Sequence, residues 1–573
     1  MLESAFSLSP TKQKLLGKTW AWRFRDQCLP LINEGAFASC YCENNGRPNA
    51  SVRVVVAMLI LKEVFNYTDE EIIEAVAFDL RFQTALGLTM DDAVPCQKTL
   101  HNFRVKLTTD ERVEKLFCEI TDQLLKQLGL ETDRARLDST QICSNIRLLS
   151  RLSRFCVTFR MLLRLLKRHA PALLGRISER VRLRYLRADD TDSSYDNTGA
   201  DEGRRRLGVC ARDNYRLVMA LRGVELPAQV AKCYLLLERL LEEQCLVLEV
   251  AATPVAEDAD IMEERVPVRL RGKGEVPSAC LQTPHDPDAT YGHKGVGSAV
   301  TFCETVGNGD KPEMITHIVI TESYASDMLQ TVPAVEALIE RGIAPKELVA
   351  DTGYGSTANL LACQELGTTL IAPVHKGATT LAGPKIYIEC LPDAPPTACS
   401  MGVIAASTER KLLKKRVHYL VSFTEEACAG CPNAPSCPAL KQADGSRLFQ
   451  IEELDAMNTL RHYIETTPAF KEKYRWRSGI EATNSECKRA HGLAKLRVRG
   501  KERVKVAVFL KGLACNVKRA MKYWQRDANT AINSAFLSLI WLNQRRTSCL
   551  IRPHVSNMVS KLNIIPPQIY RFA

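Results

Sequence analysis

Three short segments that lie far apart in the chain each place an acidic side chain at the end of a predicted element or on its face. Asp138 ends a predicted strand over residues 134–138, and Asp351 ends another over residues 347–351. Glu481 projects from a predicted helix. Because strand ends and helix faces hold side chains rigidly, a fold that joins these segments would present a cluster of carboxylates.

The Glu481 segment has the sharpest pattern. Tyr474, Arg477, Glu481 and Lys488 are spaced 3, 4 and 7 residues apart. At 100° per residue, these intervals place all four on one stripe of an α-helix. The sequence therefore predicts one helix whose stripe carries an acid, two cations and a tyrosine.

The length and composition allow several folded units. A chain of 573 residues suggests three or four domains, and 46% hydrophobic with 25% charged residues is typical of globular proteins. Lysine and arginine outnumber aspartate and glutamate by 77 to 66, for a net charge of +11. This excess favours a polyanionic partner, but a merely soluble basic enzyme fits it equally well.

The apolar segments predict no membrane span. No run reaches the 18 or so apolar residues that a span requires, and the first residues lack a basic region followed by an apolar stretch. We therefore expect a cytoplasmic protein, in which most of the 21 cysteines are reduced core residues.

Residues 51–107 contain three predicted helices, over 54–65, 69–79 and 97–107, and the second begins with a capping box. The third carries polar and basic side chains beside an apolar stripe; among them are Lys98, Asn102 and Arg104. This pattern fits a helix-turn-helix whose last helix enters a DNA groove. A plain three-helix packing module fits it as well.

Residues 145–187 carry twelve arginine and lysine residues and a single acid, on helices with one apolar face. This cationic face would suit a phosphate backbone. An ordinary solvated face fits less well, because such faces usually carry both signs of charge. Beyond an acidic loop and a further helix, the predicted order is β-β-α-β-α-β, with the strand at 134–138 ahead of it.

Three carboxylates from distant positions suit metal-dependent cleavage of a phosphodiester. Hard divalent cations such as Mg²⁺ prefer carboxylate oxygens, and two such ions can activate the attacking oxygen and stabilise the leaving one. Each acid alone also has an ordinary role, because Asp138 could cap a helix, Asp351 could stabilise a turn and Glu481 could be a surface acid.

The combination resembles the DDE transposases of bacterial insertion sequences, in the group marked by a Tyr-Arg-Glu-Lys signature. The resemblance implies an α/β ribonuclease-H-like catalytic core with a helical N-terminal domain and helical and Cys-containing insertions. It also implies that Asp138, Asp351 and Glu481 are the catalytic residues and hold two Mg²⁺ or Mn²⁺ ions.

In this interpretation, Arg477 and Lys488 bind phosphate oxygens, and Tyr474 either contacts DNA near the cut or packs against the sheet. The remaining residues that we predict to contact DNA are Arg489, Arg497, Arg499, Lys98, Asn102 and Arg104.

A second constellation is formed by cysteines. Cys428, Cys431 and Cys437 follow a C-x2-C-x5-C spacing, with Cys399 or Cys390 available as a fourth thiolate. Four thiolates would suit a closed structural Zn²⁺ site, and reduced cysteines without a metal are the alternative.

The predicted organisation is a helical DNA-binding domain over 1–125, a catalytic domain over 126–525 and a C-terminal tail over 526–573. The catalytic domain is interrupted by a basic helical insertion at about 141–250 and a Cys-containing insertion at about 376–470. Each boundary follows a change in residue pattern.

We expect a DNA transposase that cuts element ends and joins them to target DNA, associated with the bacterial nucleoid. Its partners would be double-stranded DNA and a second copy of the chain, as a homodimer in the synaptic complex. The alternatives are a ribonuclease-H-like nuclease without strand transfer and a domesticated, non-catalytic DNA-binding protein.

Overall fold

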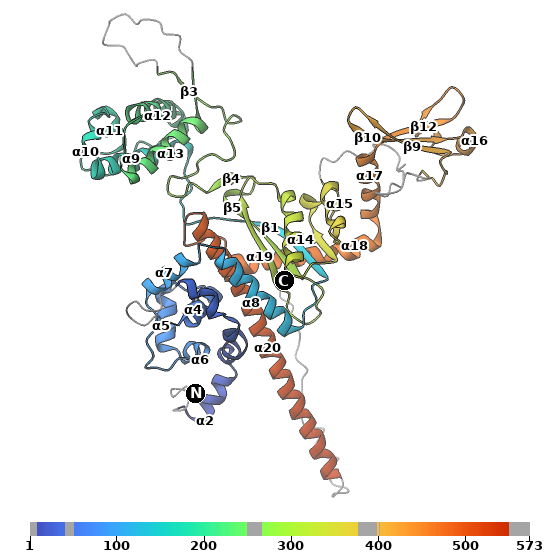
Figure 1. Cartoon of the computed structure of the whole chain (residues 1–573), viewed down its shortest axis with the longest axis horizontal. Helices are drawn as coiled ribbons and strands as arrows, with labels where there is room; N and C mark the ends of the chain where they lie inside the picture. Colours follow the sequence, from blue (N-terminus) through green and yellow to red (C-terminus); the bar gives the residue numbers. More distant parts are fainter. Residues whose placement is uncertain (1–7, 41–50, 249–265, 376–397, 400, 549–573) are drawn as a thin grey trace, which may run out of the picture.

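The centre of the molecule is a mixed β-sheet to which all other parts connect (Figure 1). The computed structural model describes residues 8–40, 51–248, 266–375, 398–399 and 401–548. Hydrophobic side chains in these residues form four cores, of which two lie on the faces of the central sheet. The other two belong to the insertions.

The sheet strands are β1 (Arg134–Ile142), β4 (Thr290–Gly292), β5 (Gly295–Thr305), β6 (Ile315–Glu322), β7 (Glu347–Ala350) and β8 (Thr369–Ile371). β5 lies antiparallel between β1 and β6, and β4 pairs with its first residues. On its other side β1 is parallel to β7, which is parallel to β8. The predicted strands are present, but the one expected over residues 290–305 is divided into β4 and β5, and β1 continues four residues beyond Asp138.

Helices cover both faces of this sheet. One face packs against α14 (Thr331–Glu340) and α15 (Thr357–Glu365), and buries Leu137 there. Because side chains alternate along a strand, Arg136 and Asp138 point to the opposite face. The 3₁₀ turn η4 (Asp327–Gln330) directly precedes α14, and the 3₁₀ turn η5 (Thr352–Tyr354) follows β7.

The N-terminal region is helical, and its three predicted helices are confirmed. The capping box at Thr68 and Glu71 is present. The elements are α2 (Pro10–Gly17), α3 (Trp20–Arg23), η1 (Phe24–Cys28), η2 (Leu29–Leu31), η3 (Glu34–Cys40), α4 (Val52–Val64), α5 (Asp69–Phe78), α6 (Leu80–Leu86), α7 (Gln97–Lys106) and α8 (Arg112–Leu128).

One long helix, α20 (Lys501–Ser548), joins the N-terminal helices to the sheet. Its buried side chains, including Val508 and Leu513, share a core with α4, α8, β5 and β6. This helix was not predicted from the sequence. It continues past residue 525 and extends beyond the other elements (Figure 1). Among the helices of the described residues, none is both long and apolar enough to cross a membrane.

The first insertion is a helical unit with its own core, and its acidic loop packs against its basic helices. Arg160 and Arg164 each bind an aspartate of this loop at 2.6 Å, and Lys167 binds a third. Part of the predicted cationic face is therefore neutralised within the chain. The elements are α9 (Arg151–His169), α10 (Pro171–Leu174), α11 (Glu179–Tyr185), α12 (Ala200–Leu221), α13 (Ala228–Gln244), β2 (Cys245–Val247) and β3 (Val268–Leu270).

The Cys-containing insertion holds a small antiparallel sheet in the order β11-β12-β10-β9, beside α17 (Glu453–Thr466). Its strands were not predicted, because β9 is polar and largely exposed. The elements are β9 (Ser407–Leu413), β10 (Arg416–Phe423), α16 (Glu425–Cys428), η6 (Ala434–Ser436), β11 (Leu440–Lys441) and β12 (Arg447–Glu452).

The prediction of one continuous helix from Tyr474 to Lys488 is wrong. The segment is divided into α18 (Pro468–Tyr474), the 3₁₀ turn η7 (Arg475–Ser478) and α19 (Gly479–Ala490). Arg136 of β1 donates from Nη1 to the carbonyl oxygen of Trp476 at 3.0 Å. The guanidinium sits so close that a side chain at Gly479 would collide with it. This contact anchors the turn to the sheet.

We expect His317 of β6 to make the stability of the folded protein sensitive to acid. Burial and the nearby Arg341 lower the pKa of His317 to about 4. The unfolded chain therefore takes up this proton at a higher pH than the folded protein does. We expect the free energy of unfolding to fall by about 2–3 kcal/mol between about pH 6.5 and pH 4 through this residue.

Urea unfolding of His317→Gln across this pH range tests the prediction. In His317→Gln, the free energy of unfolding should fall less between about pH 6.5 and pH 4 than in the wild type. His101→Gln, at an exposed site on α7, should show the wild-type dependence on pH. An unchanged profile in His317→Gln would contradict the assignment.

Candidate active site

The fold brings Asp138, Asp351 and Glu481 together. β1 and β7 are parallel with Leu137 opposite Ala350, so Asp138 and Asp351 are the next residues on neighbouring strands. Helix α19 packs against β1 and carries Glu481.

Arg477 connects the three carboxylates. Its Nη2 atom lies 4.0 Å from Asp138 Oδ2 and 3.9 Å from Asp351 Oδ2, while Nη1 donates to Glu481 Oε1 at 2.7 Å. Since one guanidinium reaches all three acids, they share a single site.

The acids differ in their exposure to solvent. The side chain of Asp138 is 11% exposed, that of Asp351 is 35% exposed and that of Glu481 is 60% exposed. The site is therefore closed at β1 and open on the side of α19, where a substrate could approach.

Asp138 is held from two sides. The backbone N–H of Ser139 donates to its Oδ1 at 2.9 Å, and Asn484 Nδ2 donates to its Oδ2 at 3.2 Å. Burial raises the pKa of Asp138 to about 6, although the Ser139 hydrogen bond and Arg477 oppose the shift. Its charge is thus poorly solvated, which favours a bound cation.

Asp351 is fixed by its own turn, because the N–H of Gly353 donates to Oδ1 at 2.7 Å. Its Oδ2 is the atom that faces Arg477. The carboxylate is therefore oriented before any ligand binds.

The donor set suits a hard divalent cation. Three carboxylates supply the oxygen ligands that Mg²⁺ and Mn²⁺ prefer, with solvent access for water and phosphate at Glu481. The Oδ1 atom of Asn484 is buried without a hydrogen-bond partner, while the amide nitrogen of the same side chain binds Asp138. An oxygen without a donor beside the acids fits a site that accepts a cation.

Two lysines add positive charge at the closed end. Lys294 Nζ donates to Ser139 Oγ at 2.9 Å and lies 3.4 Å from Asp327 Oδ2. Burial and Lys294 lower the pKa of Lys488, which also interacts with Asp138. These cations are placed to bind a phosphate group near the acids.

Tyr474 has features of both roles considered for it. Its ring stacks on Phe470 with the centroids 5.5 Å apart, which is a packing contact. Burial raises the pKa of its hydroxyl, and Arg477 and Asp351 are among the charges that act on it. The side chain therefore lies at the edge of the acidic site.

The other residues predicted to contact DNA divide into two groups. Lys98, Asn102, Arg489 and Arg499 are exposed. Arg104 is half-buried and binds Asp69 through both guanidinium nitrogens, while Arg497 is exposed and donates to the backbone oxygens of residues 66 and 67. These two arginines have structural partners within the N-terminal region.

Cys399, Cys428, Cys431 and Cys437 line one cavity beside the small sheet, among apolar side chains. Burial raises the pKa of Cys428, and the other three cysteines contribute to that shift. Cys390 lies outside the described residues.

Sequence reasoning missed Asn484, Lys294 and Ser139 as members of the site. Asn484 follows Glu481 by three residues, so helical spacing could have indicated it. Lys294 reaches the site only because the turn between β4 and β5 lies beside β1, which no local pattern reveals.

Two segments of the chain match models of known protein families. Residues 398–521 match a model described as Transposase DDE domain, and residues 13–106 match one described as Transposase domain (DUF772). Together, the matches support a DDE transposase. The first segment includes Glu481 and the four cysteines, whereas Asp138 and Asp351 lie outside both. No curated protein and no solved structure matches the chain significantly.

We expect Arg477 to stabilise the negative charges of the three carboxylates when no metal is bound. In Arg477→Gln, three neighbouring carboxylates lose their shared cation, so the free energy of unfolding should fall by about 1–3 kcal/mol without divalent ions. Added Mg²⁺ should restore part of the loss. Denaturant unfolding with and without Mg²⁺ measures both effects.

Arg475→Gln is the matched control, because Arg475 is exposed and lies over the ring of Trp476 in the same turn. It should change stability little. Equal destabilisation by both substitutions would contradict a special role for Arg477.

Proposed function

We propose that this chain is a metal-dependent DNA transposase with a ribonuclease-H-like core. The observation that carries the proposal is the convergence of Asp138, Asp351 and Glu481 on one guanidinium. The strand order β6-β5-β1-β7-β8, with β5 alone antiparallel to its neighbours in the core, supports that fold. The two transposase matches support the substrate, double-stranded DNA.

Asp138 and Asp351 would hold the cations from the sheet, and Glu481 would complete the set from α19. Two bound Mg²⁺ or Mn²⁺ ions supply activation of the attacking oxygen and stabilisation of the leaving oxygen in phosphodiester cleavage. Asn484 and the N–H groups of Ser139 and Gly353 keep the aspartates in place.

Arg477 has a second role once substrate is present. Its planar guanidinium matches the phosphate oxygens, and cations that bind the three acids would replace its contacts with them. Lys488 and Lys294 lie on the same side and can neutralise the scissile phosphate. The freed 3′-hydroxyl of the element end would then attack target DNA at the same acids.

Lys98, Asn102, Arg489 and Arg499 are exposed and are proposed as further DNA contacts. A synaptic complex must hold two element ends, so a homodimer is the proposed active form. Salt-dependent binding to element ends would follow from these basic contacts.

Cleavage of element-end DNA tests the acids. Glu481→Gln keeps the size of the side chain and removes its charge, so Mg²⁺-dependent cutting should fall by at least about a hundredfold with DNA binding retained. Glu472→Gln, an exposed acid on α18, is the matched control and should cut normally. Undiminished cutting by a folded Glu481→Gln protein would reject the assignment.

The same assay separates transposition from simple cleavage. Products in which the element end is joined to a second duplex support strand transfer, whereas cut ends without joined products favour a nuclease. Binding without any cutting would instead favour a non-catalytic DNA-binding protein.

The four cysteines are proposed as ligands of a structural Zn²⁺ ion, since they line one cavity and thiolates suit this metal. Cys428→Ser combined with Cys431→Ser should remove about one zinc per chain and destabilise the small sheet. Metal analysis of the purified protein measures the change. Zinc content equal to the wild type would contradict these ligands.

A further inference from the structure

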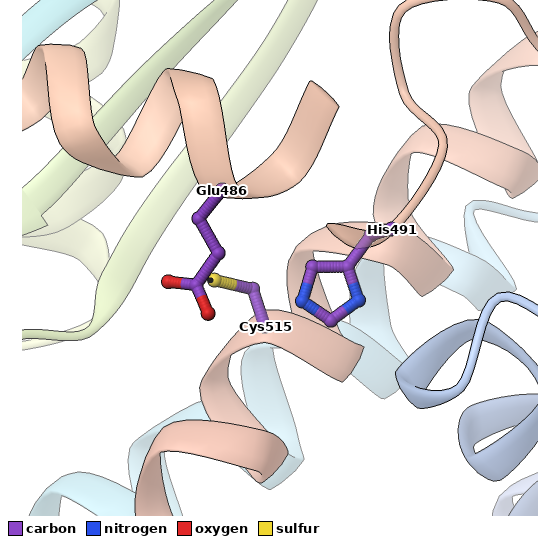
Figure 2. A group of neighbouring side chains, drawn as sticks. All are labelled: Glu486, His491 and Cys515. Carbon is purple, nitrogen blue, oxygen red and sulfur yellow. Dashed lines mark hydrogen bonds between the residues drawn. The ribbon is translucent and has the colours of Figure 1, made fainter. Parts of the chain in front are cut away.

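A second group of metal-ligating side chains lies between α19 and α20, apart from the acidic site. Glu486 projects from α19, His491 is the residue that ends α19, and Cys515 projects from α20 (Figure 2). The ligand atoms of these three residues all lie within 4.8 Å of one another. In the described part of the chain, this is the one group of three or more such residues whose ligand atoms lie this close together.

This group faces away from the catalytic acids. At 100° per residue, Glu486 lies about 140° around α19 from Glu481, whereas Lys488 returns to the side of Glu481. The two sides of one helix therefore carry two different donor sets.

His491 is prepared to act as a ligand. Its side chain is fully buried, and its Nδ1 atom lies 2.9 Å from the backbone oxygen of Glu63. A carbonyl oxygen only accepts hydrogen bonds, so Nδ1 carries the proton and Nε2 presents its lone pair. This buried Nε2 atom makes no hydrogen bond of ordinary geometry, and the imidazole interacts with the Cys515 thiol. A backbone carbonyl behind the imidazole is the usual support of a metal-bound histidine.

The sulfur and carboxylate donors complete the arrangement. Cys515 is buried, and its Sγ atom lies 3.7 Å from Glu486 Oε2. Cys487 of α19 is also buried and interacts with Cys515, but its sulfur is not one of the ligand atoms that all lie within 4.8 Å of one another. Nitrogen, sulfur and oxygen donors in a closed core suit tetrahedral Zn²⁺.

The surrounding charges are compatible with an ion of charge 2+. Glu486 also binds Arg519 at 3.1 Å and lies 3.4 Å from Lys518, so its carboxylate is shared with these cations. Deprotonation of Cys515 would offset part of the charge of the added ion, and its proton would leave to solvent. Without a metal, the Cys487 thiol and burial raise the pKa of Cys515, so its sulfur stays protonated.

We infer that His491, Cys515 and Glu486 bind one structural Zn²⁺ ion that fastens α19 to α20. Lys511 of α20 already links the backbone oxygen of His491 to the carboxylate of Glu63 in α4. An ion here would therefore fix the end of the catalytic helix against both α20 and the N-terminal helices. This inference does not depend on DNA cleavage.

Metal analysis of the full-length protein tests the site. Cys515→Ser and His491→Gln should each lower the zinc content by about one equivalent relative to the wild type. Cys363→Ser is the matched control, because Cys363 is a buried cysteine of α15 outside the group, and it should keep the wild-type content. Circular dichroism establishes that each variant is folded.

Cobalt substitution adds a readout of the ligand itself. Co²⁺-loaded wild-type protein should show a thiolate charge-transfer band that persists in Cys428→Ser/Cys431→Ser and weakens in Cys515→Ser. If Cys515→Ser and His491→Gln do not fold, the Cys428→Ser/Cys431→Ser double variant tests the inference instead, because it should still retain about one zinc per chain. A double variant without zinc, or folded Cys515→Ser and His491→Gln proteins with full zinc content, would overturn the inference.

Discussion

The active-site geometry depends on Arg477, which holds three like charges in one place. Two of the acids are neighbours on parallel strands, and the third comes from a helix more than a hundred residues later. Their mutual repulsion would open the site if no cation lay between them. The guanidinium supplies that cation, so the three acids are held together without a metal.

A buried ion network places α19 where this contact can form. Glu304 of β5 is fully buried and accepts hydrogen bonds from Arg136 at 2.7 Å, Arg519 at 3.1 Å and Thr483 at 2.7 Å. These partners come from β1, α20 and α19. Removing Glu304 would leave the buried guanidinium of Arg136 without its carboxylate partner, which is strongly destabilising. The acid helix is therefore fixed to the sheet by electrostatics as well as by apolar packing.

Local patterns predicted much of the fold. The helices of the N-terminal region and the strands of the central sheet have strong periodicity and clear caps, as at Thr68 and Glu71. The acids at 138, 351 and 481 could be chosen because each follows or lies on such an element, and the structure brings them together.

The remaining features depend on contacts between distant residues. The turn at Arg475–Ser478 interrupts a good helical spacing. Arg136, more than three hundred residues earlier, donates a hydrogen bond to the carbonyl oxygen of Trp476 in this turn. Arg104 and Arg497 look like DNA ligands in the sequence, but each has a partner within the N-terminal region. The group of Glu486, His491 and Cys515 joins two helices whose packing no spacing rule specifies.

The central claim is that the three acids form one divalent-cation site. The most direct measurement is anomalous scattering from crystals of the protein soaked in Mn²⁺. The account predicts anomalous density between Asp138, Asp351 and Glu481, with Arg477 displaced from the carboxylates. Manganese bound elsewhere, with these acids still held by Arg477 at saturating Mn²⁺, would contradict it.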